Sequence, residues 1–170
     1  MALTKVIGSG LGAIPAISGA NLTGFTDAQM PAGSVLQAVT ATRSTAQAES
    51  SNSFVTSSLA VAITPRSTSS KVLLSGTLFA AVPSGGQLHY HIYRSHGGTD
   101  AFVTSTTYGF GGLHLNGGSG ESATPVSFLD SPSRTDAVTY TIYIQSTGTD
   151  NAQIHDNNRL STLTAMEIQG

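Results

Sequence analysis

The sequence predicts an all-β protein, an antiparallel sandwich or barrel built from short strands that are joined by turns. Charged residues make up only 9% of the 170-residue chain, so the helix formers Glu, Lys and Arg are scarce. Thr, Val, Ile and Tyr pack well on a pleated sheet and supply most of the periodic segments, and many of the 19 glycines separate these segments. Short segments punctuated by turn residues are typical of an all-β domain.

Residues 1–33 form the first predicted unit, an extended N-terminal arm that serves for attachment or as a stalk. This region is rich in Gly and Ala, contains two prolines, and follows neither the period of a strand nor that of a helix. Its larger apolar residues are too widely spaced for a private core and suit chains that wrap around one another. These residues are Ile17, Leu22 and Phe25.

Residues 34–170 form the second unit, a head domain in which six strands are predicted. The strands cover residues 34–42, 54–64, 71–80, 88–94, 137–146 and 160–168. The segments 88–94 and 137–146 alternate apolar and polar residues, as expected of strands with one buried face. The segment 71–80 is apolar on both faces, which indicates a strand covered on both sides. The last segment is expected inside its sheet, and the polar stretch 47–52 is expected to be a loop.

The sequence argues against nucleic-acid binding, membrane insertion and catalysis. Its seven basic residues stand singly, so no run of phosphates would be neutralised. No apolar run approaches the roughly 20 residues needed to cross a bilayer. The acidic residues fall mostly in predicted loops, and no hydrolase pattern of Ser, His and carboxylate is present. The G-x-G-x-x-A match at residues 8–13 lacks the helix that dinucleotide binding requires. We therefore expect a protein that is not an enzyme and needs no cofactor.

His89 and His91 are a weak candidate for a metal site. They lie two residues apart in a predicted strand, so their imidazoles point to the same side of the sheet. Three copies that meet on an axis would bring three such pairs together. The competing interpretation is a polar strand face with two solvated or hydrogen-bonded histidines. We favour this second interpretation because no carboxylate partner can be identified.

The Gly-rich segment 109–122 is expected to be an exposed loop, since it carries too many glycines for a regular element. Together with neighbouring turns it would present side chains to a saccharide or a protein. The candidate binding residues are Tyr108, Phe110, His114 and Asn116. The alternative is that the glycines supply only tight turns.

Six sequence blocks resemble a known family. They are residues 31–37 (PAGSVLQ), 63–74 (ITPRSTSSKVLL), 92–99 (IYRSHGGT), 129–133 (LDSPS), 140–143 (YTIY) and 163–168 (LTAMEI). Their number and order resemble a bacteriophage virion protein family that is common in marine and cyanobacterial phages, of tail-fibre or other structural type. The resemblance spans about residues 20–170, and the segment 18–25 (SGANLTGF) is similar to the short stalk of such proteins.

The resemblance implies a β-sandwich or jelly-roll head that forms a homotrimer, and it supplies no catalytic residues. A trimer also agrees with a domain that has few aromatic residues and no cysteine. Apolar area buried between subunits would add roughly 25 cal/mol per Å² to its stability.

The expected function is that of a non-enzymatic phage surface protein in the virion, of tail-fibre or head-fibre type, which contributes to host attachment. Its expected partners are tail, baseplate or major capsid proteins, and a glycan or protein on the host surface. One alternative is a capsid decoration protein that cements the head lattice. A cellular lectin is a further alternative.

Overall fold

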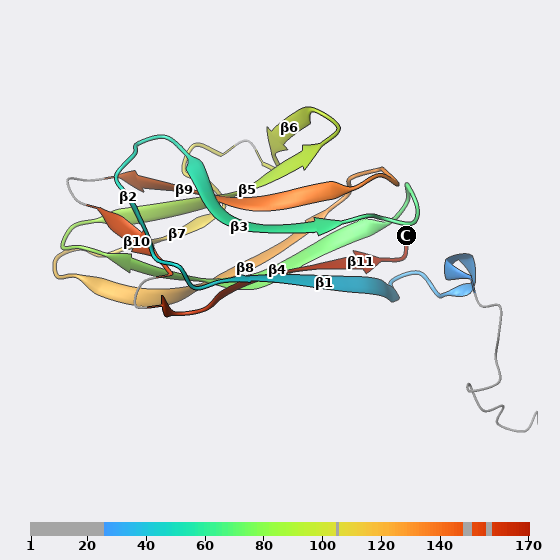
Figure 1. Cartoon of the computed structure of the whole chain (residues 1–170), viewed down its shortest axis with the longest axis horizontal. Coiled ribbons are helices and arrows are strands. Elements are labelled where there is room, and N and C mark those ends of the chain that lie inside the picture. The colour runs from blue at the N-terminus through green and yellow to red at the C-terminus, as the bar shows by residue number, and fades with distance from the viewer. Residues whose placement is uncertain (1–25, 105, 148–150, 156–157) are drawn as a thin grey trace, which may run out of the picture.

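Two antiparallel β-sheets pack face to face in the computed structural model, which describes residues 26–104, 106–147, 151–155 and 158–170 (Figure 1). The predicted all-β sandwich is therefore confirmed. The structure describes the 3-10 turn η3 (Asp27–Gln29), and no helix in the described ranges has the length and apolar character to span a membrane. The strands are β1 (Val35–Arg43), β2 (Gln47–Glu49), β3 (Val55–Ile63), β4 (Lys71–Val82), β5 (Gln87–His96), β6 (Thr99–Phe102), β7 (Gly111–His114), β8 (Gly120–Asp130), β9 (Val138–Thr147), β10 (Ala152–Ile154) and β11 (Ser161–Ile168).

Each sheet is four strands wide, because in places two short strands lie one after the other and share one position in the sheet. We call each of the four positions across a sheet a strand position. In the first sheet β2 continues the line of β1 and β10 continues the line of β11, so the order is β1/β2, β11/β10, β4 and β8. In the second sheet the order is β3, β9, β5 and then β6 and β7, which both pair with β5. The chain crosses repeatedly between the two sheets, and eight antiparallel strand positions in this order make a jelly roll.

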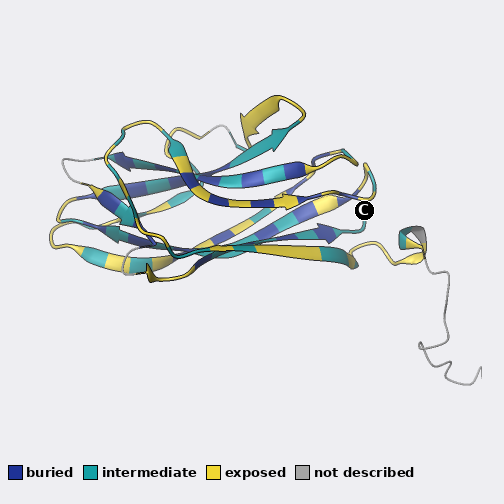
Figure 2. Ribbon diagram, in the orientation of Figure 1, coloured by how far each residue is buried: buried dark blue, intermediate teal, exposed yellow. Residues whose placement is uncertain are grey.

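The core lies between the two sheets, and the alternation of each strand decides which side chains enter it. In β9, Val138, Tyr140, Ile142 and Ile144 are fully buried and the residues between them are only partly buried, so the ribbon of β9 alternates in colour (Figure 2). Full burial of an apolar side chain contributes about 1.5–3 kcal/mol. The strand β11 lies between β1 and β4, as was predicted for the last strand.

The Gly-rich segment 109–122 is more regular than predicted, because it contains β7 and the start of β8. A Cβ on Gly111 would collide with the Tyr90 hydroxyl, and a Cβ on Gly112 would collide with the carbonyl oxygen of Leu88. Glycine therefore lets β7 approach β5 closely, and the expectation of a loop without regular elements was wrong here.

A second loop prediction was wrong in part. Residues 47–52 contain β2, which pairs antiparallel with β10, and β10 itself was not predicted. These two short strands pair with each other at one end of the first sheet. A three-residue strand is too short to show a period in the sequence, so the error has a simple physical cause.

The described part of the N-terminal arm is attached to one end of the sandwich. Asp27 forms an ion pair of 2.8 Å with Arg66, and the N–H of Gly33 donates to the carbonyl oxygen of Gln169 at 2.8 Å. The arm residues Ile17, Leu22 and Phe25 lie outside the described residues, so the division into arm and head stays a prediction.

Candidate ligand-binding face

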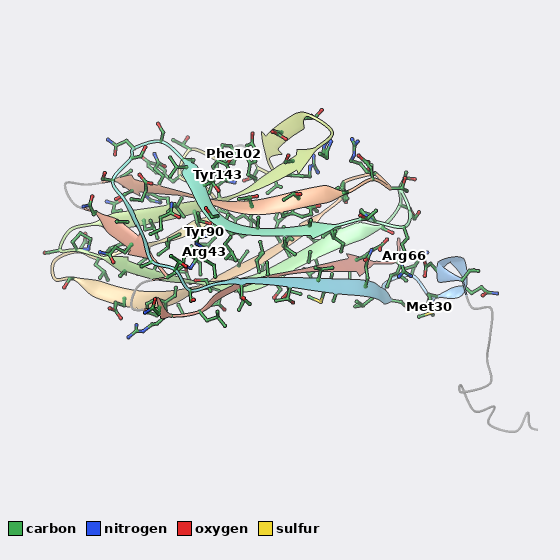
Figure 3. The ribbon with its side chains drawn as sticks, viewed as in Figure 1. Met30, Arg43, Arg66, Tyr90, Phe102 and Tyr143 are labelled. Carbon is green, nitrogen blue, oxygen red and sulfur yellow. The ribbon has the colours of Figure 1, made fainter. Side chains whose placement is uncertain are left out.

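Five aromatic rings gather on the outer side of the second sheet, and we call this surface the aromatic face. The core takes the alternate residues of β5 and β9, so the residues between them point outward. The strand register places His91 opposite Tyr143 and Tyr93 opposite Phe102. Figure 3 labels Phe102 and Tyr143 on this side of the sheet. The members of the aromatic face are Phe54, His91, Tyr93, Phe102 and Tyr143.

The rings of the aromatic face pack on one another in two layers. The ring of Phe102 lies 4.3 Å from that of His91, which is fully buried beneath it, while Phe102 itself keeps 38% of its surface exposed. The rings of Tyr93 and Tyr143 lie 4.6 Å apart and are inclined by 31°, so they form a nearly parallel pair. Phe102 meets both tyrosines edge-on. Phe102 thus fixes β6 on the sheet, and the half-exposed tyrosines border it.

His91 has a structural environment within the single chain. Its Nδ1 atom lies 3.2 Å from the carbonyl oxygen of Ile92 and its Nε2 atom lies 3.2 Å from the Thr104 hydroxyl. Burial lowers the pKa of His91, although the contacts with Ile92 and Thr104 partly oppose this shift. The imidazole is therefore neutral at pH 7, with both nitrogen atoms engaged by neighbours.

His89 lies at the border of the aromatic face, next to the predicted binding residues. Its ring centroid is 5.2 Å from that of Tyr108, and its Nε2 atom lies 3.2 Å from the Thr147 hydroxyl. Burial lowers the pKa of His89, and the nearby His114 lowers it further. In the described ranges no three His, Cys, Asp or Glu side chains gather as a metal site would require.

The four predicted binding residues separate into two groups. Tyr108 is 65% exposed beside His89, and His114 and Asn116 are exposed in and just after β7. Phe110 points inward instead, where its ring packs on Tyr90 and Phe128 at centroid distances of 6.3 and 5.4 Å. The structure therefore brings Tyr108 and His114 together around His89 and assigns Phe110 a packing role.

Sequence reasoning did not identify Tyr93, Phe102 and Tyr143 as candidate binding residues. The sequences of β5 and β9 do contain a signal for these residues. Aromatic residues occur on both faces of each strand, although only one face is needed for the core. Phe102 had no such signal, since β6 is only four residues long.

The exposed part of the aromatic face is an apolar platform with hydrogen-bonding groups at its border. Thr141 and Gln145 flank Tyr143 on β9. Burial raises the pKa of Tyr93, and Asp100 and Tyr143 raise it further, which places a carboxylate close to the platform. Flat rings beside hydroxyl and carboxylate groups suit a ligand that has an apolar face and a hydroxylated edge. A pyranose sugar has both features.

A buried ionic bridge joins the two sheets away from the aromatic face. The Nη1 atom of Arg94 donates to both carboxylate oxygens of Asp130 at 2.9 Å, and the Tyr140 hydroxyl donates to the same carboxylate at 2.6 Å. Burial raises the pKa of Tyr140, and Asp130 raises it further. Arg94 and Tyr140 belong to the second sheet and Asp130 to the first, so this bridge fixes the sheets relative to each other.

A buried His and Ser pair resembles part of a catalytic site but is closed to substrates. The Nδ1 atom of His155 lies 2.7 Å from the Ser161 hydroxyl, and both residues are fully buried. The same hydroxyl accepts the N–H of Phe79 at 2.9 Å, so Ser161 links His155 to the backbone of β4. The pair thus satisfies backbone and side-chain groups where β10 meets β4.

Comparisons with known proteins support the fold. No protein-family model matches the chain, and no curated protein matches it. A chain in the structure of infectious bursal disease virus, Gx strain, is similar with a TM-score of 0.52 and 15% identity, over 92% of this chain and 37% of that chain. A chain in the T13 particle of the same virus gives a TM-score of 0.45 and 16% identity, over 79% of this chain and 36% of that one. The chain thus spans little more than a third of either neighbour, and the first likeness concerns the fold alone.

Proposed function

We propose that this chain is a non-enzymatic structural component of a virion, a phage surface protein of tail-fibre or head-fibre type that acts as a homotrimer. The observation that carries the proposal is the jelly roll formed by eight strand positions, an architecture found in viral coat and lectin domains. The similar fold of a chain in the structure of infectious bursal disease virus also supports a structural role in a virion. The family resemblance of the strand blocks supports the narrower assignment to phages.

In this function the aromatic face is the surface that contacts the host. Tyr93 and Tyr143 present rigid, amphipathic rings that bind at low entropic cost, because each side chain has few rotatable bonds. A single shallow platform binds a saccharide weakly. Three heads on each fibre, and several fibres on each particle, convert weak binding into strong attachment through effective concentration.

A mass-spectrometric inventory of purified particles, followed by cryo-EM, tests the virion assignment. We expect the chain among the particle proteins, with three copies around one axis and residues 1–33 in a coaxial three-chain stalk. An arm that spreads across neighbouring capsid subunits would replace the fibre assignment by a capsid decoration role. Absence of the chain from the particles would overturn the proposal altogether.

Replacing Tyr143 with alanine tests the aromatic face as the host contact. The substitution removes one ring of the nearly parallel pair, so binding of the fluorescent chain to an array of neutral bacterial surface oligosaccharides should fall at least tenfold. Thr139→Ala is the matched control, because Thr139 lies on the same side of β9 but outside the aromatic face. Thr139→Ala should bind like the unmodified chain. Equal losses in both variants, or no binding by the unmodified chain, would show that host contact occurs elsewhere.

A further inference from the structure

The outer side of the first sheet carries side chains in straight rows that cross all four strands. In one row, Leu129 on β8, Leu73 on β4, Met166 on β11 and Ala38 on β1 are direct cross-strand partners. Leu129 is 50% exposed, and Leu73 and Met166 are half-buried. Cross-strand partners lie about 5 Å apart on one face, so these four residues form a continuous apolar stripe.

The next rows on the same side consist of short polar side chains. The row adjacent to the stripe contains Ser127, Ser75, Thr164 and Thr40, and the two threonine hydroxyls lie 2.9 Å apart. The row after it contains proline and threonine only. Neither row nor the stripe includes a charged residue. We call the three rows together the flat face.

The strand β4 shows that the flat face is built to be covered. On its inner side Val72 and Leu74 are fully buried in the core, and on its outer side Leu73 belongs to the apolar stripe. Partly exposed apolar side chains such as Leu73 and Leu129, gathered in one stripe, are typical of a surface that another layer covers. Within the described part of the chain no layer covers this side.

The geometry points to a second copy of this chain as the covering layer: we infer that the flat face is the surface through which the copies associate. Hydroxyl groups both donate and accept hydrogen bonds, so a row of Ser and Thr is complementary to an identical row. The apolar stripe is likewise complementary to itself. Identical copies also carry the same net charge of −2, and the flat face lets them meet without placing like charges opposite each other.

The size of the flat face fits the centre of an interface between copies. On β4 the three rows extend from Leu73 to Thr77, roughly 17 Å, and four strand positions are roughly 19 Å wide. The product, roughly 320 Å², is less than half of the roughly 800 Å² that each partner contributes to a typical specific interface, so side chains around the flat face supply the remainder.

This inference rests on the proposed function only for the number of associated copies, which is three. It is tested on the purified full-length chain. In sedimentation velocity between 1 and 50 μM the unmodified chain should sediment as a trimer. Thr164→Lys places a lysine in the middle of the flat face, at a strand inside the sheet, and should shift the chain to monomers with at least a hundredfold weaker association. Thr139→Lys, on the outer side of the other sheet, should leave the trimer intact.

Three outcomes would overturn the inference: an unmodified chain that is monomeric at 50 μM, a Thr164→Lys variant that stays associated, or equal dissociation of both variants.

Far-UV circular dichroism of each variant separates loss of association from loss of folding. The variant Thr164→Ser, which keeps the hydroxyl, should retain the trimer. A dimer that Thr164→Lys dissociates would support the flat face and contradict the threefold arrangement of the proposed function. A trimer absent from purified particles would contradict the virion assignment and leave the flat face supported.

Discussion

Replacing Asp130 with alanine is expected to lower the free energy of unfolding by about 3–5 kcal/mol, which is the usual cost of breaking a buried ion pair. The carboxylate is 9% exposed and accepts hydrogen bonds from both Arg94 and Tyr140. Alanine leaves a guanidinium and a buried hydroxyl without their acceptor. Because the three residues join the two sheets, the loss affects the packing of one sheet on the other as well as the local contacts.

Thermal and chemical unfolding measure this effect, and Asp136→Ala is the matched control. Asp136 forms an ion pair of 2.8 Å with Arg134, but its side chain is 53% exposed. Exposed ion pairs contribute about 0–1 kcal/mol, so this variant should unfold almost like the unmodified chain. The Asp130→Ala midpoint should fall by about 10 °C in a domain of this size. Similar small shifts in both variants would mean that the buried bridge does not stabilise the sandwich.

The long strands could be predicted from the sequence because one face of each is buried. In β9 the alternation of Val138, Tyr140, Ile142 and Ile144 with polar residues corresponds to the observed burial at every position. The same holds for the core residues of β5 and β11. Successive side chains of a pleated strand point to opposite faces, so the period of two appears in the sequence whichever strands are the neighbours.

The strand β8 could not be predicted in the same way, although it is one of the longest. It contains Pro125, which lacks an N–H group and normally argues against a strand. β8 lies at the edge of the first sheet and pairs with β4 alone, so a proline is tolerated there. The Pro125 carbonyl oxygen also accepts the hydroxyl of Tyr90 from the opposite sheet. Edge position is a property of the fold, and the sequence does not contain it.

The candidate site was predicted only in part because sequence reasoning placed it on loops. Glycine and turn residues indicated an exposed loop at 109–122, and Tyr108 and His114 are indeed exposed beside His89. Four of the five rings of the aromatic face lie on the strands β5, β6 and β9, and Phe54 immediately precedes β3. The register between β5, β6 and β9 brings them together, and only the folded chain fixes that register.

Stability should decrease as the pH falls from about 6.5 toward 4, and His155 is responsible for much of this decrease. Burial, together with the nearby Arg43, lowers the pKa of His155 to about 4, although the contact with the backbone of Ser57 partly opposes the shift. In the unfolded chain the ordinary pKa of histidine is near 6.5. The unfolded state therefore binds more protons in this window, so its population grows as the pH falls. The contribution of His155 is fully present above pH 6.5 and amounts to about 3 kcal/mol.

The variant His155→Asn isolates this contribution. His155 has a φ of 55°, in the left-handed region, and asparagine tolerates that conformation better than other replacements. Its amide can both donate and accept, so it can replace the hydrogen bond of 2.7 Å between the Nδ1 atom of His155 and the Ser161 hydroxyl. Urea unfolding at several pH values should show a steeper loss of stability between pH 6.5 and 4.5 for the unmodified chain than for the variant. The pKa of Glu167 lies below its ordinary value despite burial, because Ser70, Arg66 and Gln37 favour its charged form. Glu167 therefore contributes equally to the acid sensitivity of the unmodified chain and of the variant. Parallel profiles for the two proteins would mean that the buried imidazole does not set the acid limit of the fold.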